Sequence, residues 1–439
     1  MSDHTGAHVA RQRSRLTASV TDLDVVRQRA LLIGLIRSSN DRARGEASLD
    51  ELALLTDTAG SEPVVSELVR RERPDPATYL GKGKLSELVG ISKVEDIDVV
   101  VFDNDLSPAQ QRNLQQAFQC DVVDRVALIL DIFAQHAHTK EGMLQVELAQ
   151  YRYRLPRLRG KGTVLSRLGA GIGTRGPGET KLETDRRRIL DRIRKIEREL
   201  KDAQRSRETR SKRRRGSGSP VVAIVGYTNA GKSTLFNQLT NAGVLVEDRL
   251  FATLDSTVRK LELPHGHSAL VSDTVGFVRD LPHELVEAFR STLEEAADAD
   301  LLVHLVDASD ADPDGQIASV RIVLDEIGAS DVPELIVFNK TDAIDKTATD
   351  RLKSLYGDAE FISALTGDGV DTLLDTVVEG LDAATIELSL LVPYDRGDVL
   401  AETHAIGDVL AQDHTESGTA VTVRLPHDEA HHFRNFVAE

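Results

Sequence analysis

Two glycines, a lysine and a serine follow a short apolar run in the segment "VVAIVGYTNAGKST", residues 221–234. Gly226, Gly231, Lys232 and Ser233 fit the pattern G-x-x-x-x-G-K-S/T, in which backbone N–H groups wrap around nucleotide phosphates. The lysine of this pattern supplies a positive charge at the β- and γ-phosphates, and the serine hydroxyl binds Mg²⁺. These residues therefore predict a magnesium-dependent nucleotide site.

Three later motifs decide which nucleotide is expected. "LVSDTVGF" contains Asp273 and Gly276, "LIVFNKTD" ends with residues 339–342, and "EFISAL" ends with residues 363–365. Asp273 is expected to hold Mg²⁺ through water, and the Gly276 N–H to sense a γ-phosphate. In this order after the phosphate loop, D-x-x-G, N-K-x-D and S-A-L are typical of guanine-nucleotide switches, so we predict GTP as the ligand.

Guanine selectivity has a physical basis in Asp342, whose carboxylate can accept hydrogen bonds from both N1–H and the 2-amino group of guanine. Adenine lacks both donors and would leave the carboxylate unpaired. Asn339 is expected to bond the N7/O6 edge, and the Lys340 stem to cover the face of the base. The residues predicted to bind GTP are Gly226, Tyr227, Thr228, Asn229, Ala230, Gly231, Lys232, Ser233, Thr234, Phe251, Ala252, Thr253, Leu254, Asp255, Asp273, Thr274, Val275, Gly276, Asn339, Lys340, Thr341, Asp342, Ser363, Ala364 and Leu365.

The segment "DRLFATLDST" (248–257) must supply a switch hydroxyl that reaches Mg²⁺ when the γ-phosphate is present. Thr253, Ser256 and Thr257 are candidates, and spacing does not choose among them. Phe277 follows D-x-x-G, where many switches carry a glutamine that orients water, and a phenylalanine cannot do so. No catalytic group is identified, and we expect slow hydrolysis that a partner accelerates.

Strands and helices must hold these motifs in place. From Val221, strands alternate with helices to about residue 385, as in a doubly wound sheet. The front of the chain predicts a small α/β domain with a helix capped by Ser48. Its expected strands are 29–36 and 97–103, and its expected helices are 48–58, 107–118 and 124–137.

A helical hairpin is predicted between these two domains. One coiled-coil-like seam has Leu144, Leu148, Tyr151 and Leu155, and the other has Ile189, Ile193, Ile196, Leu200 and Ala203. Pro156 should end the first helix near Leu155, and Thr180 with Glu183 should cap the second. The five glycines between Gly169 and Gly178 would then form the loop at the tip.

Charge is distributed unevenly along the chain. The net charge is −17, yet residues 151–215 contain 23 Lys and Arg against 8 Asp and Glu. A basic segment in an acidic protein indicates an anionic partner. Arg175, Arg186, Arg187 and Arg188 are the residues predicted to bind RNA.

The fold class expected is α/β and multidomain: an N-terminal α/β domain with a helical hairpin, a doubly wound P-loop domain and a small α+β C-terminal domain. One cysteine, no signal-peptide pattern and no long apolar run indicate a cytoplasmic protein, with peripheral membrane contact left open. The expected ranges are 1–28 disordered, 29–138 N-terminal domain, 139–215 hairpin, 216–220 linker, 221–385 P-loop domain and 386–439 C-terminal domain.

From about residue 29 onward, several segments resemble the HflX GTPases, a branch of the P-loop switches related to translation factors. The resemblance implies that Thr253 is the switch ligand of Mg²⁺, and that the protein docks on the large ribosomal subunit. The sequence departs at Ser256, where the family usually has proline. The most specific segments are "YLGKGK" (79–84), "SPAQQRNL" (107–114), residues 122–158 and "LSRLGAGIGTRGPGETKLETDRRRI" (165–189), followed by "GYTNAGKSTLFN", "FATLD" and "DTVGF".

The leading hypothesis is a monomeric, GTP-hydrolysing factor that binds the large ribosomal subunit through ribosomal RNA, with a role in protein synthesis, ribosome splitting, rescue or biogenesis. A signalling switch is the alternative, with the basic segment facing an acidic protein or a membrane. A third hypothesis makes "GAGIG" (169–173) and "GKGK" (81–84) a second nucleotide site, which no preceding strand supports at the first motif.

Overall fold

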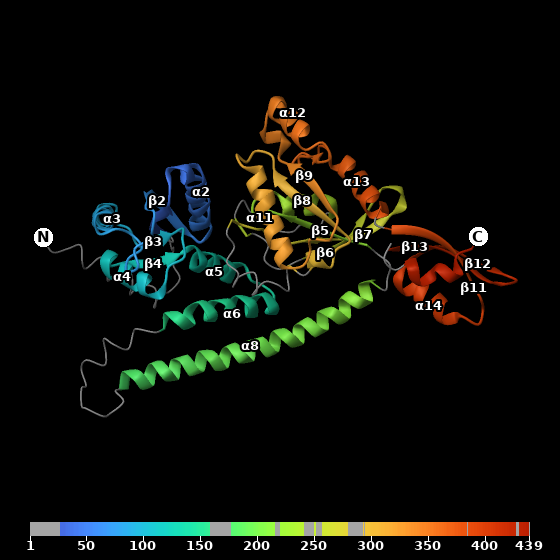
Figure 1. Cartoon of the computed structure of the whole chain (residues 1–439), viewed down its shortest axis with the longest axis horizontal. Helices are drawn as coiled ribbons and strands as arrows, with labels where there is room; N and C mark the ends of the chain where they lie inside the picture. Colours follow the sequence, from blue (N-terminus) through green and yellow to red (C-terminus); the bar gives the residue numbers. More distant parts are fainter. Residues whose placement is uncertain are drawn as a thin grey trace, which may run out of the picture.

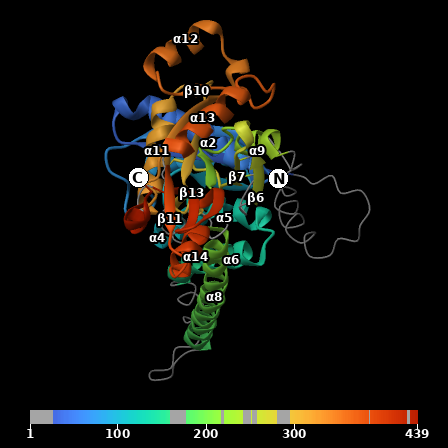
Figure 2. The same cartoon turned by 90° about the vertical axis from the view of Figure 1, so that its right-hand side faces the viewer.

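The computed structural model describes three sheets and the helices around them. The two views place α8 (Pro177–Arg215) and α12 (Lys346–Leu355) at opposite edges of the molecule (Figures 1 and 2). None of the helices in the described part of the chain is both long and apolar enough to cross a bilayer. The described residues are 27–158, 177–215, 220–240, 250–251, 257–279, 293, 295–383, 385–426 and 430–438.

The first sheet forms the N-terminal domain and is parallel throughout, in the order β2-β1-β3-β4. Helices α2 and α5 cover one face, where Leu32 and Val101 lie, and α3 and α4 cover the other, where Leu31 and Val100 lie. This alternation is typical of a sheet buried on both sides. The elements are β1 (Gln28–Ile36), η2 (Ser39–Asp41), α2 (Arg42–Thr58), β2 (Ser61–Arg70), α3 (Lys82–Val94), β3 (Val99–Phe102), α4 (Pro108–Phe118), β4 (Asp121–Asp124) and α5 (Arg125–His136).

The prediction that Ser48 caps a helix is wrong. Helix α2 begins six residues earlier, at Arg42, and Ser48 lies within it. The Ser48 hydroxyl instead donates to Asp103 Oδ2 at 2.7 Å, a tertiary partner that no local pattern indicates. Ser107 does cap α4, because its side chain accepts the Gln110 N–H.

The predicted hairpin helices α6 (Lys140–Arg157) and α8 pack side by side below the N-terminal domain (Figure 1). The seam between them contains Leu144, Leu148, Ile193 and Ile196, as predicted. Beside it, Arg192 forms a bidentate ion pair with Glu147, with N–O distances of 2.8 and 2.6 Å. Helix α8 begins at Pro177, so the predicted capping box at Thr180 and Glu183 is wrong. Proline suits the first turn of a helix, where its missing N–H has no partner to lose.

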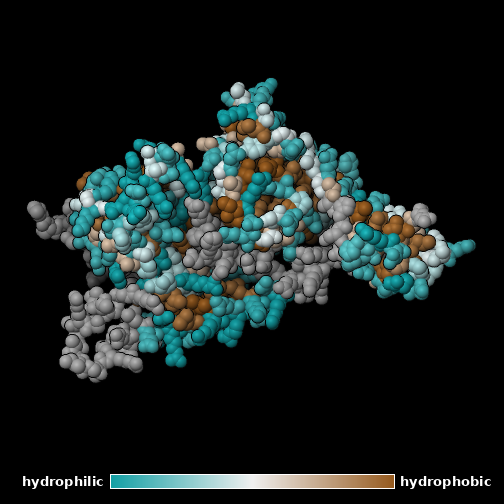
Figure 3. Space-filling view, viewed as in Figure 1, coloured by the Kyte–Doolittle hydropathy of each residue, from teal (hydrophilic) through white to brown (hydrophobic). Residues whose placement is uncertain are grey.

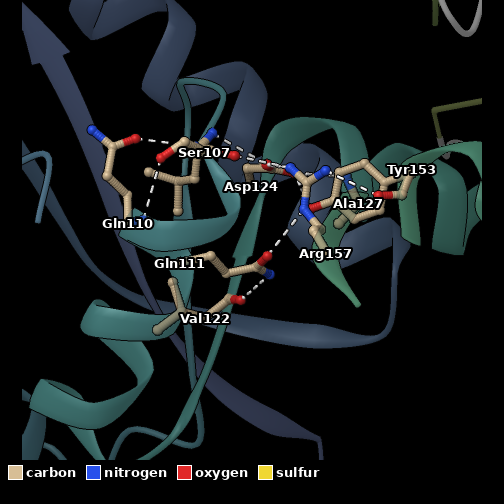
Figure 4. A network of polar contacts seen from close by, with 9 residues as sticks. Ser107, Gln110, Gln111, Val122, Asp124, Ala127, Tyr153 and Arg157 are labelled. Atoms are coloured by element: carbon tan, nitrogen blue, oxygen red, sulfur yellow. Dashed lines mark hydrogen bonds and ion pairs between the residues drawn. The ribbon is translucent and has the colours of Figure 1, made fainter. Parts of the chain in front are cut away.

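Helix α6 continues past Pro156 to Arg157, two residues beyond the predicted end. Arg157 secures this last turn, because its guanidinium bonds Asp124 Oδ2 and the Leu106 carbonyl and lies 3.4 Å from the Tyr153 ring centre. The Tyr153 hydroxyl donates to Asp124 Oδ1 at 2.9 Å, and Asp124 is fully buried (Figure 4). This network joins the hairpin to the N-terminal domain.

The second sheet has the order β10-β9-β8-β5-β7-β6, parallel except for β6. Helices α9 and α13 cover one face and α11 covers the other. The elements are β5 (Val221–Gly226), α9 (Lys232–Thr240), β6 (Thr257–Glu262), η4 (Pro264–Gly266), β7 (Ser268–Asp273), β8 (Leu301–Asp307), α11 (Pro313–Glu326), β9 (Glu334–Asn339), η5 (Thr341–Ala343), α12, β10 (Glu360–Phe361) and α13 (Val370–Ala383).

The third sheet is a small antiparallel one, in the order β11-β13-β12. Helix α14 and the short η6 cover it, with Phe433 fully buried. Its elements are β11 (Thr385–Val392), α14 (Gly397–Ile406), β12 (Asp408–Thr415), β13 (Gly418–Pro426) and η6 (Ala430–Phe436).

Candidate nucleotide site and its neighbours

The predicted phosphate loop connects the end of β5 to the start of α9, at the carboxyl edge of the parallel strands. Gly226 has φ 151°, and a Cβ there would lie 2.2 Å from the Leu305 carbonyl oxygen. Gly231 has φ 93°, and its Cβ would lie 2.3 Å from Asn339 Nδ2. Both positions therefore require glycine, and the helix that follows presents its N-terminus to an anion.

Lys232 is buried inside this loop. Its Nζ donates to the carbonyls of Gly226 at 3.1 Å and Tyr227 at 2.8 Å. Burial lowers the pKa of Lys232 to about 8, and the nearby Asp273 carboxylate opposes that shift. Gly276 of the D-x-x-G motif lies alongside, because a Cβ on it would be 3.1 Å from Lys232 Nζ. The structure thus brings the predicted lysine and γ-phosphate sensor together.

The two predicted magnesium-site residues of the sheet also meet. Ser233 Oγ donates to Asp273 Oδ2 at 2.8 Å, and Asp273 is fully buried at the end of β7. A hydroxyl and a carboxylate are oxygen ligands of the kind Mg²⁺ prefers, so this donor set fits the ion. Thr257 begins β6 directly opposite Asp273 in the ladder. Residues 252–256, which include Thr253, lie outside the described part of the chain.

The predicted base-binding motifs converge from β9 and β10. Asn339 is buried, and its amide donates to the Ala230 carbonyl and accepts from the Ala364 N–H, both at 2.8 Å. It therefore connects the phosphate loop to the S-A-L loop, a role that the motif alone does not reveal. Ser363 Oγ donates to Asp342 Oδ1 at 2.6 Å, which orients that exposed carboxylate.

Lys340 has a left-handed φ of 65°, and its Nζ pairs with Asp307 Oδ2 at 2.8 Å. Leu365 is 77% exposed beside this loop, an apolar side chain left open at the rim of the site. The contacts of Asn339, Lys340 and Asp342 with a guanine base stay predictions.

Two predicted nucleotide-site side chains point elsewhere. The Phe251 ring is buried and lies edge-on to Phe133 of α5, with ring centres 4.6 Å apart. The Tyr227 hydroxyl donates to Glu51 of α2 at 2.7 Å. Sequence reasoning missed both contacts with the N-terminal domain, since nothing in either local pattern points to a partner more than a hundred residues away.

Phe277 is 1% exposed, and its ring belongs to the same apolar cluster as Val275 and Val278. Its backbone pairs with the phosphate loop: the Thr228 N–H donates to the Phe277 carbonyl at 2.7 Å. An aromatic ring in this position packs and cannot orient a water molecule.

The predicted RNA-binding arginines lie on α8, except for Arg175, which is outside the described residues. Arg186, Arg187 and Arg188 are exposed, and Arg188 is 3.9 Å from Asp185 of its own helix. The face of α8 turned away from α6 is hydrophilic (Figure 3).

The "GKGK" motif of the third hypothesis lies at the start of α3, where Gly81 is the N-cap. Lys84 pairs there with Glu67 at 3.0 Å and Glu87 at 2.8 Å, so its charge is already balanced by two carboxylates. "GAGIG" lies outside the described residues.

Three family models match the chain in succession. They are described as GTP-binding GTPase N-terminal, over residues 46–134, GTP-binding GTPase Middle Region, over 136–214, and 50S ribosome-binding GTPase, over 221–340. The last of them spans the phosphate loop, D-x-x-G and the start of N-K-x-D.

Relatives in three bacteria carry the name GTPase HflX. The Caldanaerobacter subterraneus protein is 46% identical over 411 residues, which is 94% of each chain. The Lacrimispora saccharolytica protein is 46% identical over 92% of this chain and 95% of its own, and the Escherichia coli protein is 42% identical over 86% and 89%. The chain therefore belongs to the HflX family of GTPases, and it binds and hydrolyses GTP.

Proposed function

We propose that this GTPase associates with the large ribosomal subunit in a GTP-dependent manner, with a role in protein synthesis, ribosome splitting, rescue or biogenesis. The observation that carries the proposal is the exposed arginine face of α8 on a protein of net charge −17. Exposed arginines are the side chains that neutralise the phosphates of a nucleic acid backbone. The family model described as 50S ribosome-binding GTPase supports the same partner. A ribosomal partner places the protein in the cytoplasm.

The packing of the hairpin supports this use of α8. The Arg192–Glu147 pair and the apolar seam hold one face of α8 against α6, and Arg157 holds α6 on the N-terminal domain. Arg186, Arg187 and Arg188 therefore project from a supported helix. Side chains carried on a fixed helix lose less backbone conformational entropy on binding than those of a mobile tail do.

Co-sedimentation with purified large subunits tests the proposal. We expect the protein to pellet with subunits in a nonhydrolysable GTP analogue and to remain mostly in the supernatant with GDP. Equal recovery in the supernatant with both nucleotides would favour the alternative, a signalling switch whose basic segment meets an acidic protein or a membrane.

Guanine recognition is assigned in this proposal to Asp342, with Ser363 orienting its carboxylate. Mg²⁺ is assigned to Ser233 directly and to Asp273 through water, with Thr253 as the switch ligand that the family resemblance implies. When bound, the ion neutralises charge on the β- and γ-phosphates. Ser233 and Asp273 contribute by holding their oxygens 2.8 Å apart at the edge of the sheet.

We expect large ribosomal subunits to accelerate GTP hydrolysis by about 10²-fold or more, because buried Phe277 cannot position the attacking water. Release of inorganic phosphate, with and without purified subunits, measures the effect. Small subunits at the same concentration are the control. Turnover that is equally fast without subunits would contradict the need for an external group.

The quadruple variant Arg175→Ala, Arg186→Ala, Arg187→Ala, Arg188→Ala is expected to bind large subunits more weakly and with a flatter salt dependence. Each phosphate contact that is lost removes about 0.7 to 0.9 from the slope of log affinity against log salt. Affinity is measured by co-sedimentation across a salt series, and GTP binding should be unchanged.

A matched control replaces Arg194, Arg198 and Arg205 by alanine, since these are exposed arginines farther along α8. The quadruple variant should lower the slope of log affinity against log salt more than this control variant does. An unchanged slope in the quadruple variant would mean that these arginines belong to a solvated helix face and not to an RNA contact.

A further inference from the structure

One side chain of the phosphate loop, that of Thr228, carries a buried hydroxyl with no polar contact. Thr228 is 6% exposed, and its hydroxyl has no hydrogen-bond partner within the part of the chain that the structure describes. Two neighbouring hydroxyls are paired: Ser233 donates to Asp273, and Thr274 donates to the Ile224 carbonyl at 2.7 Å. A buried hydroxyl without a partner is costly, and catalysis is one reason for a protein to keep it.

Thr228 lies where two predicted phosphate-binding residues approach each other. A Cβ placed on Gly276 would be 2.7 Å from Thr228 Cγ2, 3.0 Å from Thr228 Cα and 3.1 Å from Lys232 Nζ. Thr228 and the Lys232 ammonium group therefore border the same point beside Gly276. Lys232 is predicted to bind the β- and γ-phosphates, and the Gly276 N–H is predicted to sense the γ-phosphate. Thr228 consequently lies beside the expected position of the γ-phosphate.

Backbone hydrogen bonds fix Thr228 in this place. Its N–H donates to the Phe277 carbonyl at 2.7 Å, and the Phe277 N–H donates to the Gly226 carbonyl at 3.2 Å. The backbone of Thr228 is thus held against the D-x-x-G segment, while its side chain can still change rotamer. One staggered step about χ1 brings Oγ1 to the position that Cγ2 occupies beside Gly276. The hydroxyl is then directed at the point that Gly276 and Lys232 share.

The reaction at this point requires a group that orients the attacking water. Phe277 follows Gly276, but its ring is packed in an apolar cluster and has no hydrogen-bonding atom. A threonine hydroxyl can accept a hydrogen bond from a water molecule and donate its own hydrogen to a phosphate oxygen. Thr228 therefore has the hydrogen-bonding capacity that Phe277 lacks, on the neighbouring segment of the chain.

We propose that Thr228 is a catalytic residue whose hydroxyl accepts a hydrogen bond from the attacking water and donates one to a γ-phosphate oxygen. The water oxygen bonds to the γ-phosphorus as the bond from that phosphorus to the β,γ-bridging oxygen breaks. The bridging oxygen leaves on GDP with the electron pair of that bond. A water proton passes to a γ-phosphate oxygen, and inorganic phosphate is released.

The Thr228 hydroxyl stays neutral throughout this step, so its contribution is that of one hydrogen bond. A partner that supplies a further group would add to that contribution. The inference requires only GTP hydrolysis by this chain, so it holds or fails independently of the ribosomal partner.

Steady-state turnover of the full-length chain without ribosomal subunits tests this inference. Thr228→Val keeps the shape of the side chain and removes the hydroxyl. Its kcat is expected to fall about tenfold while KM for GTP stays within about threefold, because the lost bond acts in the transition state. Thr228→Ser keeps the hydroxyl and removes the methyl group, and its kcat should stay within about threefold of that of the unaltered protein.

Binding of a transition-state analogue provides a second measurement. GDP with aluminium fluoride imitates the phosphoryl group during transfer, and its affinity for Thr228→Val is expected to fall about tenfold. The affinity for GDP alone should be unchanged, since GDP has no γ-phosphate. Equal losses of both affinities would show that Thr228 supports the shape of the phosphate loop, and would overturn the inference.

Thr240→Val is the matched control, because Thr240 ends α9 in the same domain and its hydroxyl donates to the Phe236 carbonyl of its own helix at 2.7 Å. This variant should leave kcat unchanged. Thermal unfolding of Thr228→Val should give an unchanged or higher Tm, since replacing an unpaired buried hydroxyl by a methyl group removes no bond. Unaltered kcat in Thr228→Val would overturn the inference, and so would a Thr228→Ser variant as slow as Thr228→Val.

Discussion

Asp342→Asn is expected to weaken GTP binding by about 10²-fold or more and to shift preference towards xanthine nucleotides. The asparagine NH₂ group would face the N1–H and 2-amino donors of guanine with donors of its own, which leaves polar groups unpaired in the complex at a cost of about 1–3 kcal/mol each. Xanthine has a 2-oxo group that accepts from the amide. Competition of GTP and xanthosine triphosphate against a fluorescent GDP analogue measures both parts of the change.

The structure supplies two controls for this experiment. Ser363→Ala removes the hydroxyl that donates to Asp342 at 2.6 Å, and a smaller loss of GTP affinity without a change of base preference is expected. Asp350→Asn changes an exposed carboxylate on α12 and should have no effect. Unchanged GTP affinity in Asp342→Asn would contradict the assignment of Asp342 as the residue that recognises guanine.

Much of the fold follows from apolar runs and local caps. The strands at 29–36 and 97–103 are buried on both faces, so their unbroken apolar sequences identify them, and Ser107 and Asp124 cap α4 and α5 by local bonds. Strand β2 was missed, because it is an edge strand that contains Pro63 and buries only Val69. Pattern reasoning succeeds where burial is complete and fails at the edge of the sheet.

The nucleotide site was predictable for a different reason. Its motifs each follow a strand of one parallel sheet, and the carboxyl ends of such strands form a common edge. Lys232, Ser233 and Asp273 therefore had to meet once the strands were recognised. The Asn339 amide and the Tyr227–Glu51 bond were not predictable, because each depends on the tertiary placement of a partner at least 109 residues away.

Ser233→Ala is expected to lower kcat/KM for Mg²⁺-dependent GTP hydrolysis by about 10²-fold, because a metal ion provides several kcal/mol of charge stabilisation in phosphoryl transfer. The Ser233 hydroxyl is also the partner of buried Asp273, so its loss weakens the pair that would hold the ion. Turnover across a Mg²⁺ titration shows whether the loss arises from metal affinity, since excess Mg²⁺ would then restore part of the rate.

Ser233→Thr is the matched control, because threonine also provides the hydroxyl that this position of the phosphate loop requires. It should retain most of the activity. Thr253→Ala is expected to behave like Ser233→Ala, and Thr257→Ala to remain active, although Thr257 lies opposite Asp273 in the β6–β7 ladder. The reverse result, with Thr257→Ala inactive and Thr253→Ala active, would transfer the switch ligand to Thr257. That threonine would then reach the ion from the start of β6, and the family resemblance would have misplaced the switch by four residues.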